Sequence, residues 1–134
     1  MAGPTNLIAS DPATRWIAQG GAAGSPLRFV EALCDSAATR LERAARLIEA
    51  GQHAAAADAL RPVAEIVAEL QASLDHDAGA ELARDLDQVY GRCRERISAA
   101  HLAADPEAAR DAARWLKALR DAWTDARRQL ENRR

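Results

Sequence analysis

The chain has 134 residues, of which 49% are hydrophobic, only 4% are aromatic and 34 are alanine. Because alanine favours helices and is depleted in strands, this composition excludes a β-sandwich or a β-barrel and indicates one helical domain. The formal net charge is −2, and acidic and basic residues balance in both halves of the chain, which excludes a strongly basic nucleic-acid-binding surface.

The first 24 residues are predicted to form an arm ahead of the main domain. Asp11 and Pro12 suit the first turn of a short helix that carries Trp16 and Ile17, and a glycine-rich stretch ends it. A helix this short is not stable alone, so we expect its two large apolar side chains to dock on the main domain or to wait for a partner.

The main domain begins with two amphipathic stretches. The first opens at Ser25 and Pro26, a capping residue followed by a proline in the first turn, and ends at Gly51. The second ends in the polar loop at residues 75–79. Pro62 lies inside it and predicts a kink or a break of the helix near residues 58–62, because proline lacks an amide N–H and crowds the preceding turn.

Two further amphipathic stretches follow. The third spans about residues 79–104, and the fourth opens at Asp105 and Pro106, again a cap followed by proline. Each of the four stretches carries one apolar stripe at spacings of three and four residues, which is typical of helices in a bundle. The predicted stripes are Val30, Leu33, Ala37, Leu41, Ala44 and Ile48; Leu60, Val63, Val67, Leu70 and Leu74; Leu82, Leu86, Val89, Cys93, Ile97 and Ala100; and Ala109, Ala112, Leu116, Leu119, Trp123, Ala126 and Leu130.

Four such helices joined by short turns bury their stripes most economically by packing side by side. The sequence therefore predicts an all-α fold: an antiparallel up-down four-helix bundle over residues 25–134, with a short N-terminal helical arm over residues 1–24. No run of about 18 apolar residues is present and the N-terminus lacks a secretory pattern, so we expect a cytoplasmic protein with no membrane insertion.

The sequence also lacks the patterns of catalytic and metal centres. No histidine follows a glutamate by three residues, which a di-metal bundle site would need, and Cys34 and Cys93 share no metal or redox spacing. The adjacent side chains of Asp75, His76 and Asp77 seldom converge on one ion. We expect no enzyme, cofactor or metal. The enzyme-class rival is a phosphotransfer module that uses His53 or His101.

Several large side chains lie beside the stripes rather than on them: Phe29, Ile66, Tyr90 and Trp115. They have two interpretations. They either widen the core, since a core-facing helix needs a broad apolar face, or they form an apolar groove that takes an amphipathic segment of another protein.

One further pattern is spread over all four stretches. Its residues are Ser25-Pro26, Phe29-Val30, Leu33-Cys34-Asp35, Ala44, Glu49-Ala50-Gly51, Ile66-Val67, Leu74-Asp75, Gly79-Ala80-Glu81-Leu82-Ala83, Leu86, Tyr90, Ala100, Asp105 and Ala122-Trp123. In this order they resemble the flagellar secretion chaperones (FliS). The resemblance covers about residues 25–125 without a gap.

This resemblance implies a cytosolic chaperone that binds the C-terminal segment of flagellin, prevents its premature polymerisation and delivers it to the flagellar type III export apparatus. It also implies the client-binding residues, with Trp16 matching an aromatic of the family's N-terminal arm: Trp16, Ile17, Phe29, Val30, Leu33, Ile66 and Tyr90. Weak self-association through the same groove is left open.

The sequence departs from the family pattern at a few positions. Cys34 stands where the family usually has an aromatic residue, Pro62 where it has a basic one, and His101 where it has asparagine. The alternative hypothesis is therefore a diverged helical-bundle adaptor that binds another flagellar or regulatory protein.

Overall fold

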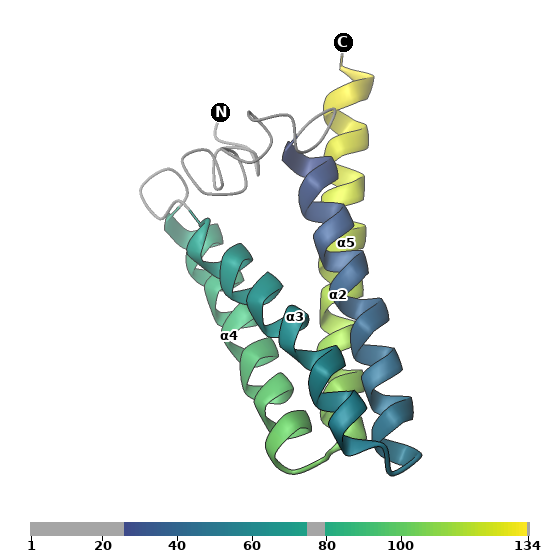
Figure 1. Cartoon of the computed structure of the whole chain (residues 1–134). Coiled ribbons are helices and arrows are strands. Elements are labelled where there is room, and N and C mark those ends of the chain that lie inside the picture. Colours follow the sequence, from purple (N-terminus) through teal and green to yellow (C-terminus); the bar gives the residue numbers. More distant parts are fainter. Residues whose placement is uncertain (1–25, 75–79, 134) are drawn as a thin grey trace.

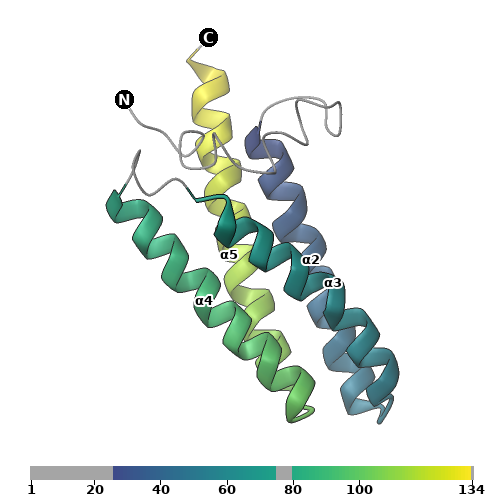
Figure 2. The same cartoon turned by 60° about the vertical axis from the view of Figure 1, so that its left-hand side comes forward.

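The computed structural model describes residues 26–74 and 80–133. Over these residues the chain forms four helices, α2 (Pro26–Glu49), α3 (His53–Ala72), α4 (Ala80–Leu102) and α5 (Pro106–Asn132). Each helix packs against its neighbours in the chain, and α5 returns to pack along α2 (Figure 1). Figure 2 brings α4 forward, with α3 beside it. The predicted all-α four-helix bundle is confirmed, whereas the arm predicted over residues 1–24 lies outside the described residues.

The end of α2 is set by a glycine, as the sequence predicts. Gly51 has a φ of +76°, a conformation that costs little only for a residue without a Cβ. Its N–H donates to the carbonyl of Ile48 (3.0 Å), and the N–H of Gln52 donates to the carbonyl of Leu47 (2.8 Å). This pair of bonds is a Schellman motif, and it satisfies carbonyls that the end of the helix would otherwise leave without donors.

The start of α5 is fixed by the predicted cap. The Asp105 carboxylate accepts hydrogen bonds from the backbone N–H groups of Glu107 (3.0 Å) and Ala108 (3.2 Å), and Pro106 occupies the first turn. The residue before the cap, Ala104, has a φ of +49°, which is unfavourable for any residue with a Cβ. The turn between α4 and α5 therefore places an alanine where glycine would be less strained.

The break expected at Pro62 is not present, because α3 is one continuous helix from His53 to Ala72 with the proline inside it. Proline at this position removes the donor that the carbonyl of Asp58 would accept from. Asp58 is exposed and Pro62 is half-buried, so this part of α3 faces outward, where water can take the place of the missing donor.

The core consists of aliphatic and small side chains from all four helices, with Tyr90 and Trp123 as its buried aromatic residues. On α4 the buried stripe runs through Ala83 and Tyr90 rather than through the predicted Leu82 and Val89. The observed stripe keeps an unbroken alternation of three and four residues, whereas the predicted one needs two successive spacings of four, and Leu82 is accordingly 47% exposed. The prediction for Leu82 is therefore wrong.

A second predicted core residue also lies outside the core, since Leu130 is 41% exposed. It belongs to the last turns of α5, where exposed positions follow one another along the helix. The apolar spacing of α5 therefore continues along the sequence past Trp123, the last residue of this helix that the bundle buries.

Charged side chains join α2 and α5 along the whole length of their contact. As the residue number rises on α2 it falls on α5, which is the register of an antiparallel pair. The ion pairs are Arg28–Glu131 (3.3 Å), Glu31–Arg127 (2.6 Å), Asp35–Arg120 (2.5 Å), Glu42–Lys117 (2.8 Å) and Glu49–Arg110. We call this series the α2–α5 charge ladder.

The most buried pair of the ladder is Glu31 with Arg127, whose side chains are each 13% exposed. Both carboxylate oxygens accept hydrogen bonds from the guanidinium group, and the hydroxyl of Thr124 donates a third at 2.6 Å. Burial raises the pKa of Glu31, but the hydrogen bonds from Arg127 and Thr124 and the nearby positive charge outweigh burial and leave this pKa below its ordinary value of 4.5.

The two unusual turn residues give a matched pair of stability predictions. Gly51→Ala is expected to lower the free energy of unfolding by about 1 kcal/mol, because a Cβ is unfavourable at positive φ. Ala104→Gly is expected to raise it by about 0.5 kcal/mol, since relief of the strain exceeds the entropy that glycine adds to the unfolded chain. Urea unfolding followed by circular dichroism measures both, and a destabilising Ala104→Gly would contradict the strain assigned to that turn.

Replacing the buried carboxylate tests the charge ladder. Glu31→Gln is expected to cost about 2 kcal/mol at neutral pH, because it removes the carboxylate charge from the most buried pair and leaves Arg127 with only the more exposed Glu131 of its own helix. The folded pKa of Glu31 lies below the unfolded one, so its contribution is fully present above about pH 4.5 and is lost as the pH falls through the folded pKa. The difference between wild type and variant should therefore shrink in acid.

The control for that measurement is Glu42→Gln, in the more exposed pair with Lys117. It should cost less than about 0.5 kcal/mol. Equal losses for the two variants would show that burial of the Glu31 pair adds nothing.

Candidate functional site

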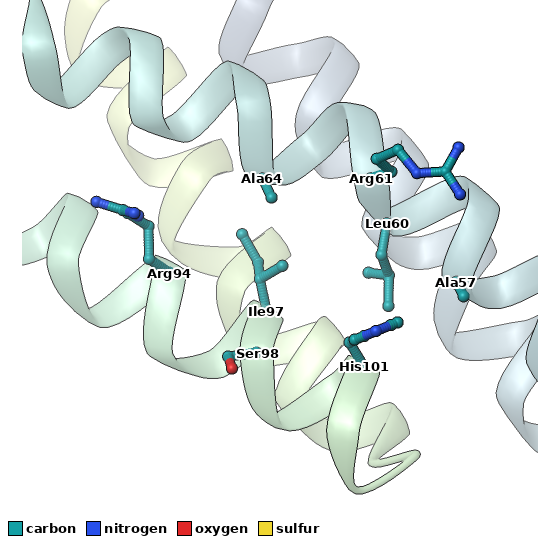
Figure 3. A pocket seen from close by; sticks show the side chains of 8 residues that line it. All are labelled: Ala57, Leu60, Arg61, Ala64, Arg94, Ile97, Ser98 and His101. Atoms are coloured by element: carbon teal, nitrogen blue, oxygen red, sulfur yellow. The ribbon is translucent and has the colours of Figure 1, made fainter.

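The contact between α3 and α4 is built differently from the charge ladder. A hollow of about 480 Å³ opens along it, lined on α3 by Ala57, Leu60, Arg61 and Ala64 and on α4 by Arg94, Ile97, Ser98 and His101. Figure 3 shows Leu60 and Ile97 pointing toward the space between the two helices, with the other side chains around them. We call this hollow the α3–α4 groove.

The groove exists because small residues flank its apolar floor. Leu60 and Ile97 are buried and form the floor, while Ala57, Ala64 and Ser98 are too short to fill the space beside them. Larger side chains at these three positions would close the contact in the way that protein interiors usually close. The alanine-rich sequence of α3 therefore leaves room for side chains from another molecule.

Polar bonds link α3 and α4 beyond the Ala64 end of the groove. The amide of Gln71 donates to the Asp87 carboxylate at 2.9 Å, and Arg94 donates to the amide oxygen of Gln71 at 3.0 Å. Arg61 pairs with Asp58 of its own helix at 3.0 Å, and both of these side chains are well exposed. These bonds hold the helices at one end of the groove and leave its floor open.

The groove continues toward the ends of the helices. A second hollow of about 400 Å³ shares Ala57, Leu60 and His101 with it and extends to His53 and Ile48. The two histidines that the sequence offers for phosphotransfer thus lie in one continuous apolar depression. An imidazole there can donate a hydrogen bond to a bound chain or accept one from it.

A smaller hollow lies between α4 and α5. It measures about 290 Å³ and is lined by Val89, Arg92, Trp115, Ala118 and Leu119. Trp115 is half-buried and packs against the core, so it both widens the core and borders the hollow. Its contact with the core agrees with the interpretation that it widens the core, whereas binding of another protein's segment beside it stays a prediction.

The predicted client-binding residues fall into three groups. Leu33 and Ile66 are half-buried side chains packed against the core on α2 and α3, and Phe29 is half-buried on α2. Phe29 and Leu33 precede Glu31 and Asp35 by two residues each, which places them roughly 200° around α2 from the charge ladder. They therefore lie on the flank of α2 away from α5.

The remaining predictions are placed differently. Val30 and Tyr90 are buried in the core, so a client reaches them only if the bundle opens, and Trp16 and Ile17 lie outside the described residues. Burial also raises the pKa of the Tyr90 phenol, which keeps it neutral. Client contact by all seven predicted residues stays a prediction.

The α3–α4 groove itself was missed from the sequence. Its floor residues Leu60 and Ile97 appear there as ordinary core positions, and its alanines as helix-forming residues. One signal was present: Ala57 and Ala64 are seven residues apart, which places two small side chains on the same side of α3. Whether small residues leave a groove depends on the facing helix, where Ser98 is also small.

The described residues offer little for catalysis. They contain no group of three acidic, histidine or cysteine side chains that could hold a metal ion. Cys34 and Cys93 are free and buried, and burial raises the pKa of each thiol to about 12. None of the four helices has an apolar stretch long enough to cross a membrane. What the surface does offer is apolar space beside the bundle.

Comparison with known proteins agrees with this picture. The family model described as "Flagellar protein FliS" matches residues 14–130 of the chain. The chain is also 32% identical over 100 residues to the "Flagellar secretion chaperone FliS" of Salmonella typhimurium, an alignment that covers 74% of each protein. The match is similar in extent to the resemblance noted from the sequence.

Thiol labelling checks the placement of the cysteines. In the native protein Cys34 and Cys93 should react with an aromatic disulfide reagent at neutral pH more than about a hundredfold more slowly than in denaturant, because thiolate and access are both lacking. Fast labelling of one thiol without denaturant would show that the bundle opens at that position.

Proposed function

Because this chain belongs to the FliS family of flagellar secretion chaperones, we propose that it binds the C-terminal segment of flagellin in the cytosol and delivers it to the flagellar type III export apparatus. The family is one of chaperones and not of enzymes. The observation that supports a client-binding role most directly is the α3–α4 groove, a hollow of about 480 Å³ with an apolar floor between two helices of the bundle.

The chemistry of such a client suits the groove. A segment that pairs with other copies in a polymer exposes an apolar face while it is alone, and an amphipathic helix can lay that face into a groove. Occupying the groove would cover the apolar face and block contact with a second copy. This is how binding would prevent premature polymerisation.

Two sides of α3 are available to the client. Ile66 lies on one side, with Leu33 on the neighbouring flank of α2, and Ala57 and Ala64 lie on the side that faces α4. A segment that folds as it binds can cover both sides by wrapping around the helix. The predicted residues and the groove would then be parts of one extended contact.

Folding of the client as it binds is also compatible with its later release from the chaperone. Ordering a flexible segment consumes about 2 to 5 kcal/mol of the gross interaction free energy, so a large contact area need not give very tight binding. A client held in this way can be handed to the export apparatus without unfolding the chaperone.

A second candidate function is that of an adaptor for another flagellar or regulatory protein. The observation that favours it is the position of His101, which lines the groove and stands where the family usually has asparagine. An altered side chain in the groove would change which segment fits best.

Calorimetric titration with a peptide of the last forty or so residues of flagellin from the same organism tests the first proposal. We expect saturable one-to-one binding with a negative heat-capacity change, since apolar surface is buried. Ile66→Asp should weaken binding about tenfold or more, because it places a charge in an apolar contact.

The matched control is Leu82→Asp, the same kind of change at an exposed leucine on α4. It should leave the affinity within about twofold of wild type. Absence of binding by a protein with full helical content would contradict flagellin as the client and favour the adaptor function.

A further inference from the structure

We propose that the α3–α4 groove selects a helical segment with acidic residues on both sides of a short apolar stripe. This inference rests on the proposed client-binding function and specifies the client's chemistry. Its basis is the combination of the groove's length, its apolar floor and the sign of the charges along its rim.

The length of the groove sets the length of the segment. Its lining runs from Ala57 to Ala64 on α3 and from Arg94 to His101 on α4. Seven residues of helix rise about 10 Å, which is two turns. The segment therefore contributes an apolar stripe of about three side chains, spaced three and four residues apart.

The volume of the groove and its apolar floor determine the size and polarity of the side chains that fit into it. The floor of Leu60 and Ile97 is apolar, and the alanines beside it leave a volume of about 480 Å³. Such a space suits branched or aromatic side chains that enter from the partner, and a stripe of alanines would leave it partly empty. We therefore expect leucine, isoleucine or phenylalanine in the stripe.

The charged side chains that line the groove are both arginines. Arg61 and Arg94 lie on opposite sides of the groove in Figure 3, and the lining contains no aspartate or glutamate. Arg61 pairs with the exposed Asp58 of its own helix at 3.0 Å, a contact that an acidic partner can share. Arg94 bonds to the neutral amide of Gln71, and among the described residues no carboxylate lies within ion-pair distance of it. A guanidinium group in this setting favours a carboxylate from the partner.

The charge ladder shows the contrast. Each of its five cations, on α2 or α5, has a carboxylate partner across the contact. At the α3–α4 groove neither lining arginine has a carboxylate partner across the contact: Arg61 pairs with Asp58 of its own helix, and Arg94 bonds to the Gln71 amide. A basic or neutral segment would gain the apolar contacts there but not the ion pairs, so the rim discriminates between segments with the same stripe.

A second copy of this chain is a poorer occupant. Two copies docked through their α3–α4 faces would bring Arg61 and Arg94 of one molecule toward those of the other, and like charges oppose such a contact. Acidic flanks on the occupant remove this repulsion.

The test uses the full chain and two synthetic peptides of about 18 residues, long enough to form helix on binding. Both carry the same leucine stripe, one with glutamate on its flanks and the other with lysine. Fluorescence anisotropy at low salt should show the glutamate peptide binding at least about tenfold more tightly, and the difference should shrink as salt is added.

Three substitutions locate the effect. Arg94→Glu should weaken the glutamate peptide about tenfold and strengthen the lysine peptide. Arg84→Glu makes the same charge change at an exposed position of α4 outside the groove lining and should change neither affinity more than about twofold. Ala64→Trp, which fills the groove without altering charge, should weaken both peptides.

Three results would overturn the inference: equal binding of the two peptides, equal effects of Arg94→Glu and Arg84→Glu, or no effect of Ala64→Trp. Titration with the flagellin C-terminal peptide separates this failure from failure of the proposed function. Binding of that peptide without preference between the two designed peptides overturns the charge selectivity alone. Absence of binding by all three peptides to a folded protein contradicts the proposed function as well.

Discussion

The antiparallel register of α2 on α5 is the constraint on which the remaining structure depends. Five ion pairs along this contact match positions on the two helices, and both side chains of the Glu31–Arg127 pair are largely shielded from water. A slip of α5 by one turn would separate every pair and leave the most buried carboxylate without its guanidinium partner, which is costly. The apolar residues fix that these helices pack, whereas the charges fix how they align.

α3 and α4 meet through short side chains and a few polar bonds near Gln71, and their contact leaves the apolar floor of the α3–α4 groove open. The α2–α5 contact also has a hollow, of about 370 Å³, but its lining is mostly charged: Glu42, Arg46, Arg110, Arg114 and Lys117, with Ala113. The two contacts thus differ in kind: matched charges align α2 with α5, whereas α3 and α4 leave an apolar floor beside Arg61 and Arg94, neither of which has a carboxylate partner on the facing helix. An α3–α4 contact closed by larger side chains would leave no room for the client proposed above.

Much of the fold could be predicted from the sequence because its signals are local. Ser25-Pro26, Gly51 and Asp105-Pro106 mark helix ends through bonds to near neighbours, and the stripes follow from helical periodicity. The exact side that α4 buries was mispredicted at Leu82, since two stripes one residue apart look alike until the other helices choose between them. The groove and the charge ladder depend on residues from separate helices, so no local pattern reveals them. The buried positions of Val30 and Tyr90 have the same origin.

The charge ladder joins α2 and α5, the first and the last of the described helices along the chain. The two residues of each pair are separated by 61 to 103 residues of sequence. During synthesis α2, α3 and α4 leave the ribosome before α5 exists, so the apolar side of α2 meant for α5 is uncovered until the last part of the chain appears. Contacts this distant in sequence form late and slow the folding of a small domain. The protein that would keep another chain from associating too early thus passes through a stage in which the side of α2 that packs on α5 is itself exposed, and the speed of translation sets how long that stage lasts.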